Sequence, residues 1–289
     1  MRVACIGLLA LAALGCIDDA LAIRPPQTSG HRRGRSRRES SAATLASFTN
    51  SLSTDFDGVD EYARAADDAA WDATDKFTYS AWVKLDTAAT NKVLGARWRH
   101  ATQDIWVIQT NGTSGTNYGL RSFIANACAD GGTNFCDTAA TAVAQGTWTH
   151  VALVYDGTLS GNTNRLKIYV NASNAVSTCS GTIPATMQTT CTPRFTVGAM
   201  DPDGTLTRYW GPGNIDEVCA WTAALSASEV TDLYNSGKPK ICSSTLATNL
   251  IVALRMGDGD THPTLTNSTG NLNFDLVNSE AADFQTDVP

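Results

Sequence analysis

The feature that most constrains the fold is an alternation of apolar and polar residues with a period of two, which recurs from residue 51 onward. Residues 77–85 read FTYSAWVKL and alternate over nine positions, with Trp82 as an exception on the polar face. Residues 148–155 form a more continuous apolar run, as an inner strand requires, and residues 165–171 form a further strand. Turn-forming pairs separate the strands, namely Asp57-Gly58, Asn111-Gly112, Gly131-Gly132, Asp156-Gly157 and Asp203-Gly204. The pattern predicts an all-β chain of short strands joined by turns.

The composition agrees with this prediction. Charged residues make up 17% of the chain, below the roughly 25% that is usual for soluble domains. The chain has 5 Glu and 6 Lys against 23 Asp and 15 Arg. Because Glu and Lys favour helices and Asp does not, the balance favours strands and turns.

One short helix is expected near the C-terminal end of the domain. Ser226 and Glu229 have the spacing of a capping box, in which each side chain bonds the other residue's backbone N–H. Val230, Leu233 and Tyr234 form an apolar stripe, and Gly237 stands where the helix should stop.

The first 22 residues have the features of a signal peptide. Arg2 precedes an apolar run over residues 3–17, and the sequence ALA at residues 20–22 fits a cleavage site. The run is shorter than the roughly 20 residues that span a bilayer, and no other run is apolar enough to do so. A second interpretation stays open, because residues 13–16 read ALGC and resemble a permissive lipobox, in which Cys16 would carry a lipid anchor at the cell surface. We favour ordinary secretion.

A basic linker is expected over residues 23–48. It begins with Pro25-Pro26, is rich in Arg and Ser, and lacks any apolar period, so we expect it to be disordered. Residues 35–38 read RSRR and also fit a processing site with cleavage after Arg38; a solvated tether is the simpler interpretation.

The charge of the remainder argues against some partners. From Leu45 onward the chain has 14 basic and 25 acidic residues, a net charge of −11. This charge argues against a nucleic acid or another acidic surface as a partner, and it is compatible with the binding of cations.

Six cysteines follow the signal segment, and an even number in an exported chain favours disulfides. The simplest arrangement pairs neighbours in sequence: Cys128 with Cys136, Cys179 with Cys191, and Cys219 with Cys242. A metal site is the weaker alternative, since there is no CxxC motif and the four His are scattered.

Five blocks together resemble the laminin-G-like, concanavalin A-like lectin/glucanase family. They are STDFDGVDEY (53–62), FTYSAWVK (77–84), WTHVALVYDG (148–157), LKIYVN (166–171) and GNIDEVCAW with LSASEV (213–221 and 225–230). The resemblance implies a jelly-roll β-sandwich of two antiparallel sheets with one short C-terminal helix. It places the domain at residues 49–242.

The C-terminal segment, residues 243–289, is unusual for this family. Residues 249–258 and 268–273 resemble the segment that usually precedes the first block, but here they follow the domain. The segment either supplies a missing first strand, as in a circular permutation, or is a truncated second repeat. We prefer the first interpretation, because 47 residues do not easily bury a core of their own.

The resemblance implies a structural calcium ion near the sandwich edge, with Asp57 and Asp216 as ligands and Asp60 in reserve. The alternative is that Asp57 begins an Asx turn and Asp216 makes hydrogen bonds at a strand end. Catalysis is not expected. Asp55, Asp57 and Asp60 have the spacing of the family's E-x-D-x-x-E catalytic strand but the wrong residues, and that motif is absent elsewhere.

Aromatic residues outside the five blocks are candidates for sugar stacking. Trp98, Trp106 and Tyr118 lie in a stretch that the blocks do not cover, with Arg97, Arg99 and Gln103 nearby. Packing in the core or in loops is the alternative for each of them.

The sequence therefore favours a secreted or surface-tethered module that recognises a glycan or an extracellular protein. A structural module of an extracellular fibre or virion is the first alternative, and a glycoside hydrolase of the same sandwich class is the second.

Overall fold

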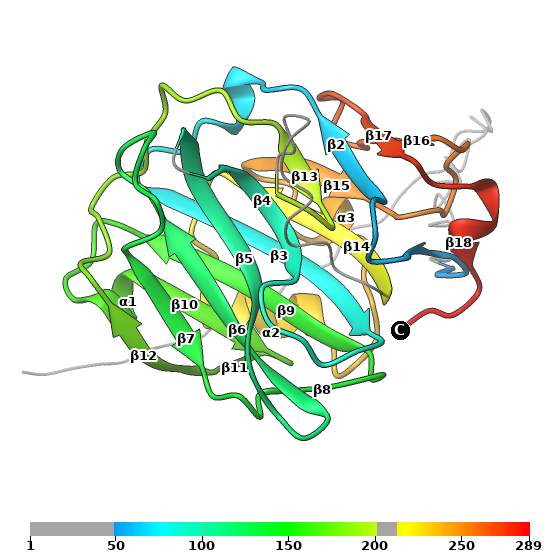
Figure 1. The fold of residues 1–289 in the computed structure, drawn as a ribbon. Helices are drawn as coiled ribbons and strands as arrows, with labels where there is room; N and C mark the ends of the chain where they lie inside the picture. The colour runs from blue at the N-terminus through cyan, green and yellow to red at the C-terminus, as the bar shows by residue number, and fades with distance from the viewer. Residues whose placement is uncertain (1–48, 101, 201–212) are drawn as a thin grey trace, which may run out of the picture. The chain divides into compact units, whose positions relative to one another are not determined.

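The computed structural model of the protein describes residues 49–289, apart from residue 101 and residues 201–212. The signal segment, Cys16, the basic linker and Arg38 lie outside the described residues. Strands form two antiparallel sheets that stack on one another (Figure 1). The predicted all-β jelly-roll sandwich is confirmed.

The first sheet has the strand order β11-β10-β9-β3-β14-β1-β18. Its strands are β1 (Ser53–Phe56), β3 (Lys76–Leu85), β9 (Thr149–Asp156), β10 (Leu166–Val170), β11 (Ser173–Asn174), β14 (Gly213–Trp221), β15 (Leu250–Leu254) and β18 (Phe284–Gln285). β1 and β15 lie end to end along one side of β14, since β1 pairs with residues 213–215 and β15 with residues 218–221.

The second sheet has the order β12-β7-β6-β5-β4-β13-β2-β17-β16, with β8 beside β6. Its strands are β2 (Tyr62–Ala65), β4 (Val93–Arg99), β5 (Gln103–Ser114), β6 (Asn117–Ile124), β7 (Phe135–Thr138), β8 (Val143–Ala144), β12 (Val176–Ser180), β13 (Phe195–Val197), β16 (Thr264–Leu265) and β17 (Phe274–Val277).

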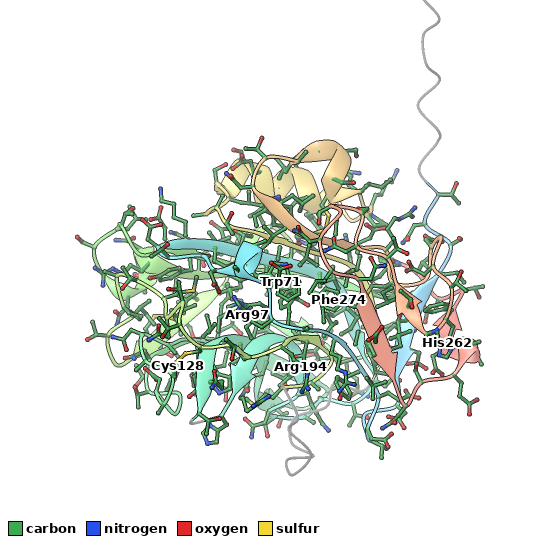
Figure 2. The ribbon with its side chains drawn as sticks, turned by 90° about the horizontal axis from the view of Figure 1, so that it is seen from above. Trp71, Arg97, Cys128, Arg194, His262 and Phe274 are labelled. Carbon is green, nitrogen blue, oxygen red and sulfur yellow. A yellow bond between two sulfur atoms is a disulfide. The ribbon has the colours of Figure 1, made fainter. Side chains whose placement is uncertain are left out.

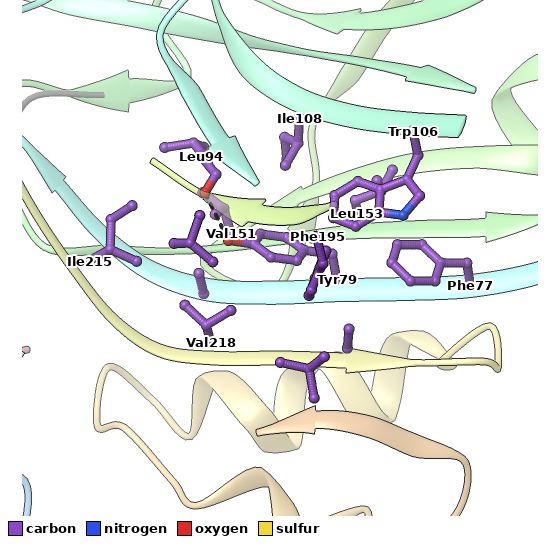
Figure 3. Packing of buried hydrophobic residues seen from close by; sticks show 14 of the residues in the cluster. Phe77, Tyr79, Leu94, Trp106, Ile108, Val151, Leu153, Phe195, Ile215 and Val218 are labelled. Atoms are coloured by element: carbon purple, nitrogen blue, oxygen red, sulfur yellow. Dashed lines mark hydrogen bonds between the residues drawn. The ribbon is translucent and has the colours of Figure 1, made fainter. Parts of the chain in front are cut away.

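The main core fills the space between the two sheets (Figure 3). Aromatic rings occupy its centre: Trp106 lies 4.7 Å from Phe77 and 5.2 Å from Phe195, measured between ring centroids. The Tyr79 hydroxyl donates to the carbonyl of Leu94 at 3.1 Å. The polar tip of this buried tyrosine is thereby satisfied.

The predicted helix is α2 (Ala227–Tyr234). Ser226 is its N-cap, both capping-box bonds with Glu229 are present, and Val230 and Leu233 are buried. α2 covers the outer face of the first sheet, where a second apolar cluster forms around Trp221. Shorter helical turns accompany it in the described part of the chain: α1 (Asn162–Arg165), α3 (Cys242–Thr245), η1 (Ala69–Trp71) and η2 (Ala281–Asp283).

The C-terminal segment contributes strands to both sheets. β15 pairs with β14 and β18 with β1 in the first sheet, while β17 pairs with β2 in the second. Asp287 also accepts a hydrogen bond from the indole of Trp148 at 2.8 Å. Residues 243–289 therefore belong to the same compact unit as the rest of the sandwich.

Two of the three predicted disulfide pairings were wrong. The structure joins Cys128 to Cys191 and Cys136 to Cys179, and only Cys219–Cys242 is as predicted. The reason is strand order: β7 and β12 are neighbours in the second sheet, and Cys136 and Cys179 stand opposite each other in their register. Neighbourhood in sequence was therefore a poor guide to neighbourhood in space.

Candidate functional site

A pocket lies on the outer face of the second sheet, where β4, β5 and β6 run side by side. Side chains alternate between faces along a strand. On β5, Trp106 and Ile108 point into the core while Val107 and Gln109 point outward. On β6, Leu120 faces the core, and the residues that alternate with it along the strand face outward. A third apolar cluster forms on this outer face, separate from the core.

The pocket has a volume of about 150 Å³. Its lining residues come from β4, β5 and β6 and from adjoining loops: Asn91, Trp98, His100, Val107, Gln109, Arg121, Phe123, Gly131, Gly132 and Met200. None of these described residues is acidic.

Aromatic rings form one wall. Phe123 is half-buried and presents the accessible ring, and Trp98 supports it with a centroid distance of 5.8 Å. Gly132 approaches both rings closely. A Cβ there would come within 3.1 Å of the Phe123 ring and 3.7 Å of Trp98, and the φ of +81° also disfavours other residues. Glycine at this position keeps the wall open to a ligand.

A buried amide supplies the polar part of the pocket. Gln109 is 4% exposed, and its Nε2 donates to Oδ1 of Asn91 at 2.9 Å. Its Oε1 is buried and has no hydrogen-bond partner among the described residues. Buried acceptors almost always have a partner, because an unmade hydrogen bond costs about 1–3 kcal/mol. Because Gln109 lines the pocket, a ligand that donates a hydrogen bond would satisfy this acceptor.

Arg121 contributes a charge that is already compensated. Its Nε and Nη2 donate to the two carboxylate oxygens of Asp137 at 2.6 and 2.7 Å. The guanidinium also lies 3.8 Å from the centroid of the Phe135 ring and 5.6 Å from that of Phe123. Such a bidentate pair fixes the side chain in one orientation.

The glycine rim of the pocket is held by hydrogen bonds and a disulfide. The Gly131 N–H donates to Asp104 at 2.9 Å, and the amides of Gly132 and Thr133 donate to Oδ1 of Asp130 at 3.2 and 3.1 Å. The backbone N–H of Asp104 donates in turn to the carbonyl of Cys128, which the disulfide ties to Cys191. The rim is therefore ordered before any ligand binds.

Two of the three aromatic residues predicted to bind a ligand lie in the core and not on the surface. Trp106 is 1% and Tyr118 0% exposed, and both belong to the core between the sheets. The prediction of a ligand role for these two residues is corrected, because their rings point to the inner face. Trp98 does line the pocket, but at 1% exposure it supports the wall rather than offering a free surface.

Arg97 also points inward. It lies between the two sheets close to Trp71 (Figure 2) and donates to the Trp71 carbonyl at 2.9 Å. It forms an ion pair with Asp72 at 3.0 Å and another with Asp67. Its role is to hold the loop before β3.

The structure does not bring the predicted calcium ligands together. Asp216 follows Ile215, which pairs with Thr54, so Asp216 lies beside the start of β1. Asp57 follows Phe56 and therefore lies beyond the end of β1. At roughly 3.3 Å per residue, this separates the two aspartates by about 13 Å along the strand. Among the residues that the structure describes, no group of three His, Cys, Asp or Glu side chains could hold a metal ion.

Both aspartates already have hydrogen-bond partners. Oδ1 of Asp57 accepts from the amides of Val59 at 2.7 Å and Asp60 at 3.3 Å, which is an Asx turn. Asp216 is buried and accepts from Asn50 Nδ2 at 2.7 Å and from the Glu217 amide at 2.8 Å. Burial and the neighbouring Glu217 carboxyl raise the pKa of Asp216 to about 8. Asp57 and Asp216 are therefore too far apart to bind the same calcium ion. Calcium binding by this protein stays a prediction.

Comparison with known proteins now identifies the family. The profile of the concanavalin A-like lectin/glucanases superfamily matches residues 57–231. The chain belongs to this superfamily. No curated protein matches it.

Among solved structures, a Bacteroides ovatus protein provisionally named a carbohydrate binding protein is similar with a TM-score of 0.54 and 15% identity, over 79% of this chain and 58% of that one. The chain thus spans little more than half of that protein. A heptameric pentraxin from Limulus polyphemus has a TM-score of 0.49 and 15% identity, over 65% and 84% of the two chains. Domain 4 of a Geobacillus stearothermophilus arabinanase, in complex with arabinotriose, has a TM-score of 0.43 and 23% identity, over 63% and 76%. At these identities the similarity concerns the fold.

In the part of the chain that the structure describes, every helix is too short or too polar to cross a membrane. The three disulfides fit an oxidising, extracellular compartment.

Proposed function

We propose that this protein is a secreted carbohydrate-binding module whose ligand occupies the pocket on the outer face of β4, β5 and β6. The observation that carries the proposal is Oε1 of Gln109, which has no hydrogen-bond partner among the described residues and belongs to a side chain that lines the pocket beside the ring of Phe123. Sugar sites combine an aromatic or apolar surface with a few polar groups that fix orientation. Membership of a superfamily that contains lectins supports the same function.

The position of the pocket on the molecule supports this assignment. The outer face of the first sheet is covered by α2 and its apolar cluster. The outer face of the second sheet carries the pocket, and its rim is anchored by the Cys128–Cys191 disulfide. A rigid rim lowers the entropy that is lost when a ligand binds.

We propose binding without cleavage. Hydrolysis of a glycoside requires two carboxyl groups flanking the bond, in most enzymes of this class. The described lining residues include no carboxylate, and both oxygens of the nearby Asp137 are engaged by Arg121. Secretion is part of the proposal, and it is supported by the signal-peptide features of residues 1–22 and by the three disulfides.

A glycan array followed by calorimetry tests the function. We expect saturable binding to a subset of glycans, and Phe123→Ala should weaken it about tenfold, since ring contacts are worth on the order of 1 kcal/mol or more. Phe284→Ala is the matched control, because Phe284 lies on β18 in the other sheet. Absence of any glycan ligand would favour the structural-module alternative, and release of sugar from polysaccharide would favour a hydrolase.

A further inference from the structure

We infer that the pocket selects a neutral sugar residue, one hydroxyl of which donates to Gln109 Oε1 and accepts from Asn91 Nδ2. Sugars that carry a carboxylate, such as sialic and uronic acids, are excluded. This inference rests on the proposed glycan-binding function and specifies its ligand class.

The first argument is the arrangement of donors and acceptors. Gln109 Nε2 donates to Asn91 Oδ1 at 2.9 Å. This bond determines which atom of each side-chain amide is left to bind a ligand. What remains is the buried acceptor Oε1 of Gln109, which has no partner among the described residues, and the donor Nδ2 of the exposed Asn91. A hydroxyl both donates and accepts, and so it satisfies the two groups together.

A carboxylate meets the opposite situation. It is an acceptor only, and so it would set its negative oxygens against the acceptor Oε1 of Gln109. That contact leaves the buried oxygen without a bond and adds electrostatic repulsion.

The second argument concerns charge. A carboxylate-bearing sugar needs a cation, and Arg121 is the permanently charged cation among the described lining residues. Its guanidinium is held by Asp137 through two hydrogen bonds and stacks on the Phe135 ring, so its charge is compensated locally. The net charge of −11 from Leu45 onward also opposes the approach of an anion.

The third argument is size. The pocket of about 150 Å³ matches the volume of a cavity that accommodates a single benzene-sized ring. The site therefore takes one pyranose ring, and Phe123 is the surface on which its apolar face lies.

The test compares neutral and sialylated or uronic-acid glycans on one array, followed by calorimetry with the best neutral ligand and its monodeoxy derivatives. We expect neutral ligands only, and one deoxy derivative that binds about tenfold more weakly, as loss of one hydrogen bond implies. Gln109→Leu should weaken the parent sugar by about the same factor and leave the affinity of that deoxy derivative unchanged. Asn91→Gly, which suits the positive φ of 58°, should also weaken the parent sugar.

Asp137→Asn provides a gain-of-function test, because it removes the negative charge that compensates Arg121 and one of its two acceptor oxygens. We expect this variant to acquire affinity for sialylated glycans that the wild type lacks. Gln285→Leu, at an exposed position on β18, is the matched control for Gln109→Leu and should leave the affinity for every glycan unchanged.

The outcomes separate the two proposals. Glycan binding confined to carboxylate-bearing sugars would overturn this inference and leave the binding function standing. Neutral binding that Gln109→Leu does not weaken would overturn the assigned contact. Absence of all glycan binding would overturn the proposed function itself.

Discussion

His150 offers a quantitative test of the structure, because it is an ionisable group buried beneath α2. It is 2% exposed, its Nε2 lies 2.8 Å from the Ser80 hydroxyl, and its Nδ1 has no partner among the described residues. Trp82 and Tyr234 pack around the ring at centroid distances of 5.4 and 6.1 Å. Burial lowers the pKa of His150 from 6.5 to about 3.

The sign of the effect follows from linkage. Between pH 6.5 and about 3 the unfolded chain binds a proton at His150 that the folded chain does not, so stability falls as the pH falls through this window. At roughly 1.4 kcal/mol per pKa unit, the loss approaches about 2–3 kcal/mol at pH 4.5 and is on the order of 5 kcal/mol at the acid limit.

His150→Gln isolates this contribution, since glutamine retains a polar contact for Ser80 but does not titrate. Burial raises the pKa of Asp216 to about 8 and that of Glu217 to about 7. Because the folded chain binds these two protons at a higher pH than the unfolded chain does, their protonation increases the free energy of unfolding as the pH falls. Their effect is common to both proteins and cancels in the difference.

Urea unfolding of wild type and His150→Gln at pH 7.5, 5.5 and 4.5 is the assay. The free energy of unfolding of the wild type should decline relative to that of the variant by about 2–3 kcal/mol between pH 7.5 and 4.5. A difference between the two proteins that stays constant over this range would refute the burial of a neutral His150.

Three further predictions concern the fold. Peptide mapping without reduction should recover Cys128–Cys191, Cys136–Cys179 and Cys219–Cys242, and recovery of a Cys128–Cys136 peptide would contradict the strand order. Gly95→Ala should lower the free energy of unfolding by about 1–3 kcal/mol in urea titrations, because its Cβ would meet the Tyr79 ring at 2.6 Å; an unchanged midpoint would contradict this packing. Deleting residues 243–289 removes β15, β16, β17 and β18 and should abolish cooperative unfolding by circular dichroism, whereas a retained cooperative transition would show that the segment is dispensable.

Much of the fold could be predicted from the sequence because the signals were local. The alternation over residues 77–85 corresponds to β3, the apolar run over residues 148–155 corresponds to β9, and the capping box of Ser226 and Glu229 begins α2. The Cys136–Cys179 disulfide could not be predicted in the same way, because these two residues meet only through the order of β7 and β12 in the sheet.

The pocket was only partly within reach of the sequence. The stretch that contains Trp98, Trp106 and Tyr118 overlaps the residues that line the pocket, but the face on which each ring lies was not assigned. The same alternation that predicts strands places Trp106 with Ile108 on the core face of β5, and Gln109 with Val107 on the other. The contact between Gln109 and Asn91 joins β5 to the loop before β4 and has no signature in the sequence.

The central claim is that a glycan binds on the outer face of β4, β5 and β6, and amide chemical-shift mapping during titration with a neutral glycan tests it most directly. The account predicts shift changes concentrated at Asn91, Gln109, Phe123, Gly131 and Gly132, which saturate with the affinity measured by calorimetry. Changes confined to the first sheet and α2, with the pocket amides unmoved, would contradict it.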